Sequence, residues 1–301
     1  MKSRPYKDDY KKIMDFLREM YLETGRQRCW LPQRWEYAEH FVNHLMIERG
    51  GDDWHKYIRI WEEDDRIVAV CNKEEANDAY LQIRPGYDYL CDEMLEYAEE
   101  KISSMNIDGK RSLVVPSPES YPSLNEQLVV RGYTRGEDVS YFNRQNLDKV
   151  FIPVLPEGYS FADAMEEKDA LRRYRVVNRA FNPDAEIPQI LPESFIKMEQ
   201  APMFRPDLEI LTKHPDGTLT SFCVVWYDEE TGIGMFEPVG THPDYQRFGL
   251  GREMLIEGLR RLKTIGARHA YVDSAGDDRK SFYNSAGFIT YDRERIWKKE
   301  F

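Results

Sequence analysis

The stretch Gln246-Arg247-Phe248-Gly249-Leu250-Gly251 decides how this chain is interpreted. It lies between a strand-like run, residues 235–241, and an amphipathic helix with Leu255, Leu259 and Leu262 on one face. Two glycines two positions apart let consecutive backbone N–H groups turn toward one point. The helix that follows directs its unpaired N–H groups and the positive end of its dipole to the same point. The stretch therefore predicts a site for an anion such as a pyrophosphate.

The second half of the chain alternates between strand and helix patterns around this stretch. The predicted strands cover residues 159–162, 208–212, 219–227, 233–241 and 270–273, followed by a closing hairpin of 288–291 and 295–298. The predicted helices cover residues 166–181, 192–200, the segment after Gly251, and 278–285. Strands that first pair as hairpins and then alternate with helices imply an α/β fold, with a mixed twisted sheet flanked by helices.

The first half repeats this order in weaker form. Its predicted helices cover residues 8–21, 34–48 and 88–103, and its predicted strands cover residues 57–61, 67–71, 79–83 and 111–115. Residues 125–133 also parallel residues 279–288, which end in the same Gly-aromatic pair. We therefore expect two tandem domains, residues 1–150 and 151–301, joined at a proline-containing segment near residues 146–156. The alternative is that the first half folds differently and the repeat is coincidental.

Composition excludes several classes of function. The formal net charge of -12 over 301 residues disfavours nucleic acid and anionic membranes as partners and favours cationic ones. The six histidines and four cysteines have no spacing typical of a metal site, so we expect no metal. No apolar segment approaches the roughly 20 residues needed to cross a bilayer, and the charged N-terminus is unlike a signal peptide, so a cytoplasmic protein is expected. The sequence does not indicate an oligomeric state.

Residues 157–301 resemble the GNAT superfamily of acyl-CoA-dependent N-acyltransferases. Three motifs carry this resemblance: Glu237-Pro238-Val239-Gly240-Thr241-His242-Pro243, the Gln-x-x-Gly-x-Gly run at 246–251, and Phe282-Tyr283-x-x-x-Gly287-Phe288. The resemblance implies acetyl-CoA as cosubstrate. The implied cofactor-binding residues are Val239, Gly240, Thr241, Gln246, Arg247, Phe248, Gly249, Leu250, Gly251 and Arg252.

Two details of the sequence agree with a bound cofactor. Arg247 and Arg252 lie where cations oppose the helix dipole unless an anion is bound, although two solvated arginines are the simpler alternative. Pro238 lacks the N–H that a central strand uses, so it predicts a break or bulge in the pairing, unless it lies on a harmless edge strand. By resemblance, the break would admit the pantetheine arm, with Val239 and Thr241 pairing to it and Gly240 allowing close approach.

Attack on a thioester requires a neutral amine, so a base must remove a proton from the ammonium form. Glu237 is the predicted base because a carboxylate in an apolar strand is costly to bury without a purpose. The alternatives are that Glu237 faces solvent or pairs with Arg247, and that a water chain or the carboxylate of Phe301 acts instead. By resemblance, Tyr283 is the acid that protonates the leaving thiolate; the alternative is an aromatic residue packed beside Phe282.

The sequence also departs from the family pattern. Gly276 stands where many family members carry a cofactor-contacting asparagine. In the first half, residues 83–87 hold one glycine and Pro85, which removes a donor N–H, and Leu128 replaces the tyrosine. We therefore expect the first domain to be a degenerate copy without the cofactor loop.

The predicted function is transfer of an acetyl group from acetyl-CoA to a primary amine of a small cationic molecule by direct attack. The alternatives are a non-catalytic acetyl-CoA-binding sensor or interaction protein, and an acetyltransferase for protein amines. A dinucleotide-binding fold is disfavoured because Met254 stands where its third glycine belongs.

Overall fold

The chain forms two compact units of mixed helices and strands. The computed structural model describes residues 1–74, 77–105 and 108–301. Unit 1 comprises Met1–Phe142 and Asp292–Phe301, and unit 2 comprises Asn143–Tyr291. This division falls within a strand rather than at the predicted position between residues 150 and 151, and it assigns the last residues of the chain to the first unit. The mixed α/β class is confirmed.

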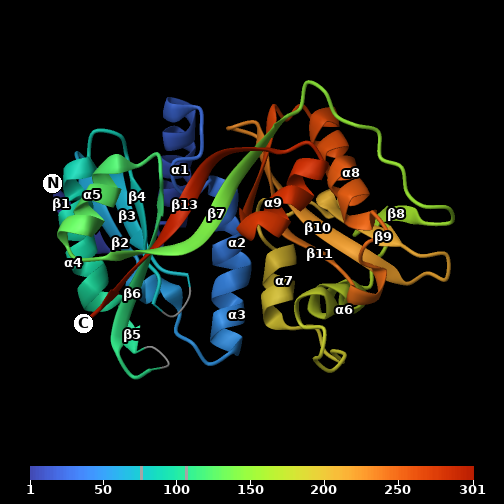
Figure 1. The fold of residues 1–301 in the computed structure, drawn as a ribbon, viewed down its shortest axis with the longest axis horizontal. Helices are drawn as coiled ribbons and strands as arrows, with labels where there is room; N and C mark the ends of the chain where they lie inside the picture. Colours follow the sequence, from blue (N-terminus) through green and yellow to red (C-terminus); the bar gives the residue numbers. More distant parts are fainter. Residues whose placement is uncertain (75–76, 106–107) are drawn as a thin grey trace. The chain divides into compact units, whose positions relative to one another are not determined.

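Unit 2 carries the glycine-containing stretch. Its elements are β8 (Ser160–Asp163), α6 (Ala170–Phe181), α7 (Glu193–Glu199), η4 (Pro206–Leu208), β9 (Glu209–Lys213), β10 (Leu219–Asp228), β11 (Ile233–Thr241), η5 (Pro243–Tyr245), α8 (Leu250–Thr264), β12 (His269–Ala275) and α9 (Gly276–Ser285). Five strands lie in the order β12-β11-β10-β9-β8, and only the β11–β12 pair is parallel. Helices α6 and α8 cover opposite faces of these strands (Figure 1).

One face of α8 packs on the sheet, and a glycine follows its last turn. The predicted apolar face of Leu255, Leu259 and Leu262 is fully buried in the core of unit 2. The helix ends at Thr264, and Gly266 follows in a left-handed conformation with φ +88°. That conformation costs glycine little, so the chain reverses there toward β12, as the sequence predicted.

Unit 1 has a similar succession of elements, with additional short ones. These are β1 (Lys2–Pro5), α1 (Tyr10–Thr24), α2 (Pro32–Tyr37), the π-helical turn η1 (Ala38–Val42), α3 (Asn43–Glu48), η2 (Trp54–Tyr57), β2 (Arg59–Glu63), β3 (Arg66–Asn72), β4 (Tyr80–Ile83), η3 (Asp88–Leu90), α4 (Cys91–Lys101), β5 (Ser104–Met105), β6 (Arg111–Pro118), α5 (Pro122–Val130) and β7 (Thr134–Asn146). Its strands form one run β1-β2-β3-β4 and a second run β5-β6-β13-β7.

Both units contain a parallel strand pair that separates soon after it begins. In unit 2, β11 pairs with β12 only from Ile233 to Met235. In unit 1, a single parallel bridge joins Asp78 and Val114 just before β4, and β4 and β6 then lie in different runs of strands. This shared feature, with the shared order of elements, confirms that the chain contains two copies of one fold.

The predicted closing hairpin is wrong. Residues Ile289–Glu300 form one continuous strand, β13, whose last part pairs antiparallel with β6 from Glu294↔Pro118 to Glu300↔Ser112. Trp297 is 7% exposed and belongs to the hydrophobic core of unit 1. Residues 292–294, which lie between the two predicted strands, include neither glycine nor proline, and the strand continues through them. Among the described residues, no helix is both long and apolar enough to span a membrane.

Candidate active site

The pairing of β10 and β11 is interrupted by a bulge at Glu237 and Pro238. Cys223 lies opposite Val239 and Val225 lies opposite Phe236, so β11 holds one residue more than β10 between these pairs. The carbonyl oxygen of Glu237 accepts a hydrogen bond from the indole N–H of Trp226. The break that the sequence predicted at Pro238 is therefore present, and a tryptophan on the neighbouring strand supports it.

The bulge reverses which side chains of β11 face α8. Before it, Gly234 lies against Leu262 of α8; after it, Gly240 lies against Phe222 and Ala180, on the side of α6. One extra residue inverts the alternation of a strand, so Thr241 turns toward α8. A Cβ at Gly240 would lie 2.5 Å from the Phe222 ring. Gly240 is thus required for packing beneath α6, which differs from the predicted reason of close approach to a ligand.

The separation of β11 from β12 opens one edge of β11. Their last paired residues are Met235 and Tyr271, although β11 continues to Thr241 and β12 to Ala275. On its other edge β11 stays paired with β10 as far as Thr241. Beyond Met235 the backbone of β11 therefore presents an edge that β12 does not fill.

The glycine stretch connects the end of β11 to α8. Arg247 and Gly249 both adopt left-handed conformations, with φ +69° and +82°, and Gly249 is the N-cap of α8. The N–H of Glu253 donates to the carbonyl of Gly249 at 3.1 Å, which begins the hydrogen bonding of α8. The backbone N–H groups of residues 247–252 make no hydrogen bond with any described residue. They are available to an anion, and the N-terminal end of the helix favours one.

Gly251 lies in close contact with β11 and α9, where a side chain has no room. A Cβ at Gly251 would lie 3.0 Å from the Thr241 hydroxyl oxygen and 3.1 Å from the Phe282 ring. The absent side chain lets the first turn of α8 approach both β11 and α9. Because the unpaired N–H groups of residues 247–252 lie beside this contact at the N-terminal end of α8, the residues present fit a pyrophosphate group.

Arg247 of the glycine stretch and Arg252, which follows it, make different contacts. Arg252 bonds through Nε to the carbonyl of Ser285 at 2.8 Å and forms an ion pair with Glu253. Its position in the first turn is therefore explained without a bound anion, so its side chain gives no support for one. Arg247 is exposed and forms no ion pair with a described residue. Phe248 is also exposed, at 56%, and Gln246 donates to the carbonyl of Thr241 at 3.4 Å.

Tyr283 lies on α9 beside the open edge of β11. It is 9% exposed and packs against Phe282 and Phe288, with ring centroids 5.1 and 6.1 Å away. Burial raises the pKa of its phenol, and the nearby carboxylate of half-buried Glu237 raises that pKa further. Its hydroxyl makes no hydrogen bond with any described residue. The structure thus brings Tyr283 and Glu237, 46 positions apart in sequence, within electrostatic reach of each other.

The corresponding turn of unit 1 is built from ion pairs. Arg84 is buried and pairs with Glu19 at 2.6 Å and with Glu23. Asp88, just before α4, pairs with Arg28 at 2.6 Å, and the first turn of α4 carries Asp92 and Glu93. These carboxylates occupy the helix end where unit 2 presents free N–H groups, and they would repel a diphosphate.

Two contacts of the site escaped prediction. Ser221 bonds to the Thr241 hydroxyl at 3.1 Å, and Phe282 supports Gly251. Only the register of β10 on β11 reveals the first, and no sequence pattern marks that register. Among the described residues, no group of three or more His, Cys, Asp or Glu side chains is arranged to hold a metal ion.

Residues 175–288 match the family model for the Acetyltransferase (GNAT) family. Two curated relatives are named mycothiol acetyltransferase. The one from Nocardiopsis dassonvillei is 30% identical over 40% of this chain and 39% of its own length. The one from Streptomyces coelicolor is 28% identical over 49% of this chain and 48% of its own length. The chain therefore spans at most about half the length of these relatives.

Solved structures extend the likeness to both units. A GCN5-related N-acetyltransferase from Sphaerobacter thermophilus has a TM-score of 0.63 and 17% identity, covering 99% of this chain and 95% of its own. A tandem GNAT protein from the clavulanic acid biosynthesis pathway has a TM-score of 0.65 and 16% identity, covering 99% and 98%. Such low identity concerns the fold alone. Residues 175–288 thus match the GNAT acetyltransferase family model, and over its full length the chain has the fold of the tandem GNAT structure.

Proposed function

We propose that this protein is an N-acetyltransferase that moves an acetyl group from acetyl-CoA to the primary amine of a small molecule. The observation that carries the proposal is the open edge of β11 beyond Met235, which leads to the free N–H groups at the start of α8. An extended thioester with a pyrophosphate at its far end would use both features: its extended arm would pair with the open edge, and its pyrophosphate would accept from the N–H groups. When bound, acetyl-CoA supplies the activated acetyl group.

Different residues of unit 2 hold different parts of the cofactor. The N–H groups of residues 247–252 hold the pyrophosphate, with Arg247 as the available cation and Gly251 as the position that keeps the turn close to β11. The open backbone edge of Val239 and Thr241 aligns the pantetheine arm as an added strand. Gln246, Phe248, Gly249 and Leu250 shape the turn, and Gly240 contributes by letting α6 pack against β11.

Proton movements fall to Glu237 and Tyr283. Glu237 receives the proton of the amine, directly or through water, because only the neutral amine carries the lone pair that attacks. Tyr283 donates its phenolic proton to the leaving thiolate, and the proton that the nitrogen loses as the amide forms returns to the phenolate, directly or through water. Burial raises the pKa of this phenol, and the same burial raises the proton affinity of a thiolate in the site; the pKa of buried Cys223 is raised in this way.

The acceptor is proposed to be a small molecule because the curated relatives are named for mycothiol rather than for a protein. The net charge of -12 favours a cationic amine. Unit 1, whose counterpart helix end carries Asp88, Asp92 and Glu93, is proposed to be a degenerate copy that does not hold the cofactor.

A thiol-release assay tests the proposal. Purified protein with acetyl-CoA is expected to release CoA thiol faster when small polyamines or amino sugars are added, with one acetylated amine formed per thiol, as measured by mass spectrometry. Acidic acceptors serve as the comparison and are expected to react slowly. Thiol release that no amine accelerates, together with tight acetyl-CoA binding, would instead support a non-catalytic sensor. Reaction with peptide amines alone would support a protein acetyltransferase.

A further inference from the structure

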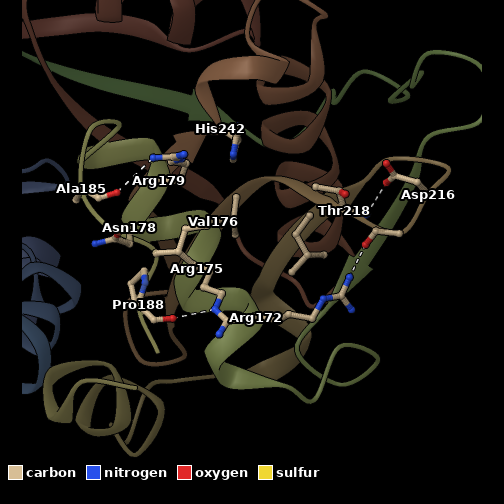
Figure 2. Close-up of a pocket in the computed structure, with 13 residues that line it drawn as sticks. Arg172, Arg175, Val176, Asn178, Arg179, Ala185, Pro188, Asp216, Thr218 and His242 are labelled. Carbon is tan, nitrogen blue, oxygen red and sulfur yellow. Dashed lines mark hydrogen bonds between the residues drawn. The ribbon is translucent and has the colours of Figure 1, made fainter. Parts of the chain in front are cut away.

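A cavity of unit 2, with a volume of about 330 Å³, lies alongside α6. It is bounded by α6, by the segment that follows α6, by the turn between β9 and β10, and by His242 (Figure 2). None of its lining residues belongs to the glycine stretch or to α9. The cavity is therefore separate from the residues proposed above for acetyl-CoA and catalysis.

Cations dominate the walls of this cavity. Three arginines of α6, Arg172, Arg175 and Arg179, line it, whereas Asp216 is the one acidic residue that does. Arg172 is already paired with Glu167 at 2.6 Å. Among the described residues, no carboxylate forms an ion pair with Arg175 or Arg179. Two half-buried guanidinium groups without a countercharge are unusual in a chain of net charge -12.

The hydrogen bonds that these two arginines make leave donors unused. Arg175 donates through Nε to the carbonyl of Pro188 at 2.9 Å, and Arg179 donates through one terminal nitrogen to the carbonyls of Pro183 and Ala185. A guanidinium has five N–H donors, and a carbonyl is neutral. These contacts fix the side chains against the segment after α6, but they do not compensate the charges.

His242 adds a donor at the same end of the cavity as Arg179, as Figure 2 shows. Its Nδ1 accepts from the backbone N–H of Asp244 at 3.2 Å, so the neutral ring carries its proton on Nε2. Burial lowers the pKa of His242; the carboxylate of Asp244 opposes this shift and the charge of Arg179 adds to it, so the pKa is lowered overall, which favours this neutral form. Buried Val176 and Leu219 provide an apolar wall next to these donors.

We propose that this cavity binds the phosphate group of a small molecule other than acetyl-CoA, through Arg175, Arg179 and His242. Arg175 and Arg179 are one helical turn apart on α6, and both line the cavity. Planar guanidinium groups match the oxygens of a phosphate, and a phosphate dianion balances two uncompensated cations. The position of Arg179 in the last turn of α6 is favoured by the helix dipole, but this does not account for Arg175.

Titration with inorganic phosphate, followed by calorimetry or by ³¹P NMR, tests the proposal without any acetyl transfer, so its failure leaves the proposed function intact. The wild-type protein is expected to bind phosphate, and Arg175→Gln/Arg179→Gln is expected to bind it about tenfold more weakly or not at all. Arg260→Gln, an exposed arginine of α8 paired with Glu257, is the matched control. Replacing the arginines also removes their hydrogen bonds to the segment after α6, which could move that segment. His242→Phe keeps those hydrogen bonds, so weaker phosphate binding by this variant would not be caused by a displaced segment.

Competition locates the phosphate. Saturating CoA and dephospho-CoA are both expected to leave phosphate binding unchanged. Displacement by CoA alone would show that the cavity holds the 3′-phosphate of the cofactor, and displacement by both would place the phosphate at the glycine stretch. Either result, or unchanged binding in the double variant, overturns the proposal.

Discussion

Gly251→Val is expected to weaken acetyl-CoA binding about a hundredfold, measured by calorimetry. A Cβ added at this position would lie 3.0 Å from the Thr241 hydroxyl oxygen and 3.1 Å from the Phe282 ring, and the two methyl groups of valine need still more room. The first turn of α8 must move away from β11, and the N–H groups of residues 247–252 move with it. Loss of two hydrogen bonds to a charged group corresponds to about this factor.

Gly136→Ala is the matched control for this variant. A Cβ at Gly136 would lie 3.1 Å from the carbonyl of Ile296, so the steric conflict is similar, but it is located in unit 1. We expect Gly136→Ala to lower thermal stability without weakening acetyl-CoA binding. Full binding by a folded Gly251→Val protein would contradict the role of the turn, and equal weakening by both variants would indicate a general loss of stability.

Much of unit 2 could be predicted because its local signals agree with its tertiary packing. The apolar positions of α8 repeat at helical spacing, and β11 is bounded by a glycine and by a histidine-proline pair, so the predicted strand 233–241 matches the observed one. Where local signals are weak, the prediction was wrong. Residues 292–295 are charged, yet they continue β13 because β6 of unit 1 provides the pairing partner, and no pattern within unit 2 encodes that partner.

The candidate site shows the same limit. Its glycines, Pro238 and Tyr283 are conspicuous because each has a chemical property that ordinary strands and helices do not need. By contrast, Arg175 and Arg179 look like the polar face of an amphipathic helix, and His242 looks like a turn residue. Only the packing of α6 beside the β9–β10 turn brings them around one cavity. The available signal in the sequence was the spacing of four residues between Arg175 and Arg179, which places them on one face of a helix.

Tyr283→Phe is expected to reduce turnover about tenfold or more while acetyl-CoA affinity stays unchanged. Phenylalanine keeps the ring that packs against Phe282 and Phe288, so it removes only the hydroxyl. That hydroxyl has no hydrogen-bond partner among the described residues, so its loss leaves no buried group unsatisfied. Steady-state kinetics of thiol release, with calorimetry for the affinity, measure the two quantities separately.

The pH dependence of the wild-type enzyme provides a second test of the same residue. Burial and Glu237 raise the pKa of Tyr283, so its phenol stays protonated below that raised value and deprotonates only above it. Activity is therefore expected to show no alkaline decline due to this group at or below pH 10, the usual phenol value. Tyr227→Phe, which removes a hydroxyl from β10 near the start of β11, is the control and should leave turnover unchanged. Unchanged turnover in Tyr283→Phe would remove Tyr283 as the acid, and the leaving thiolate would then take its proton from water at the open edge of β11.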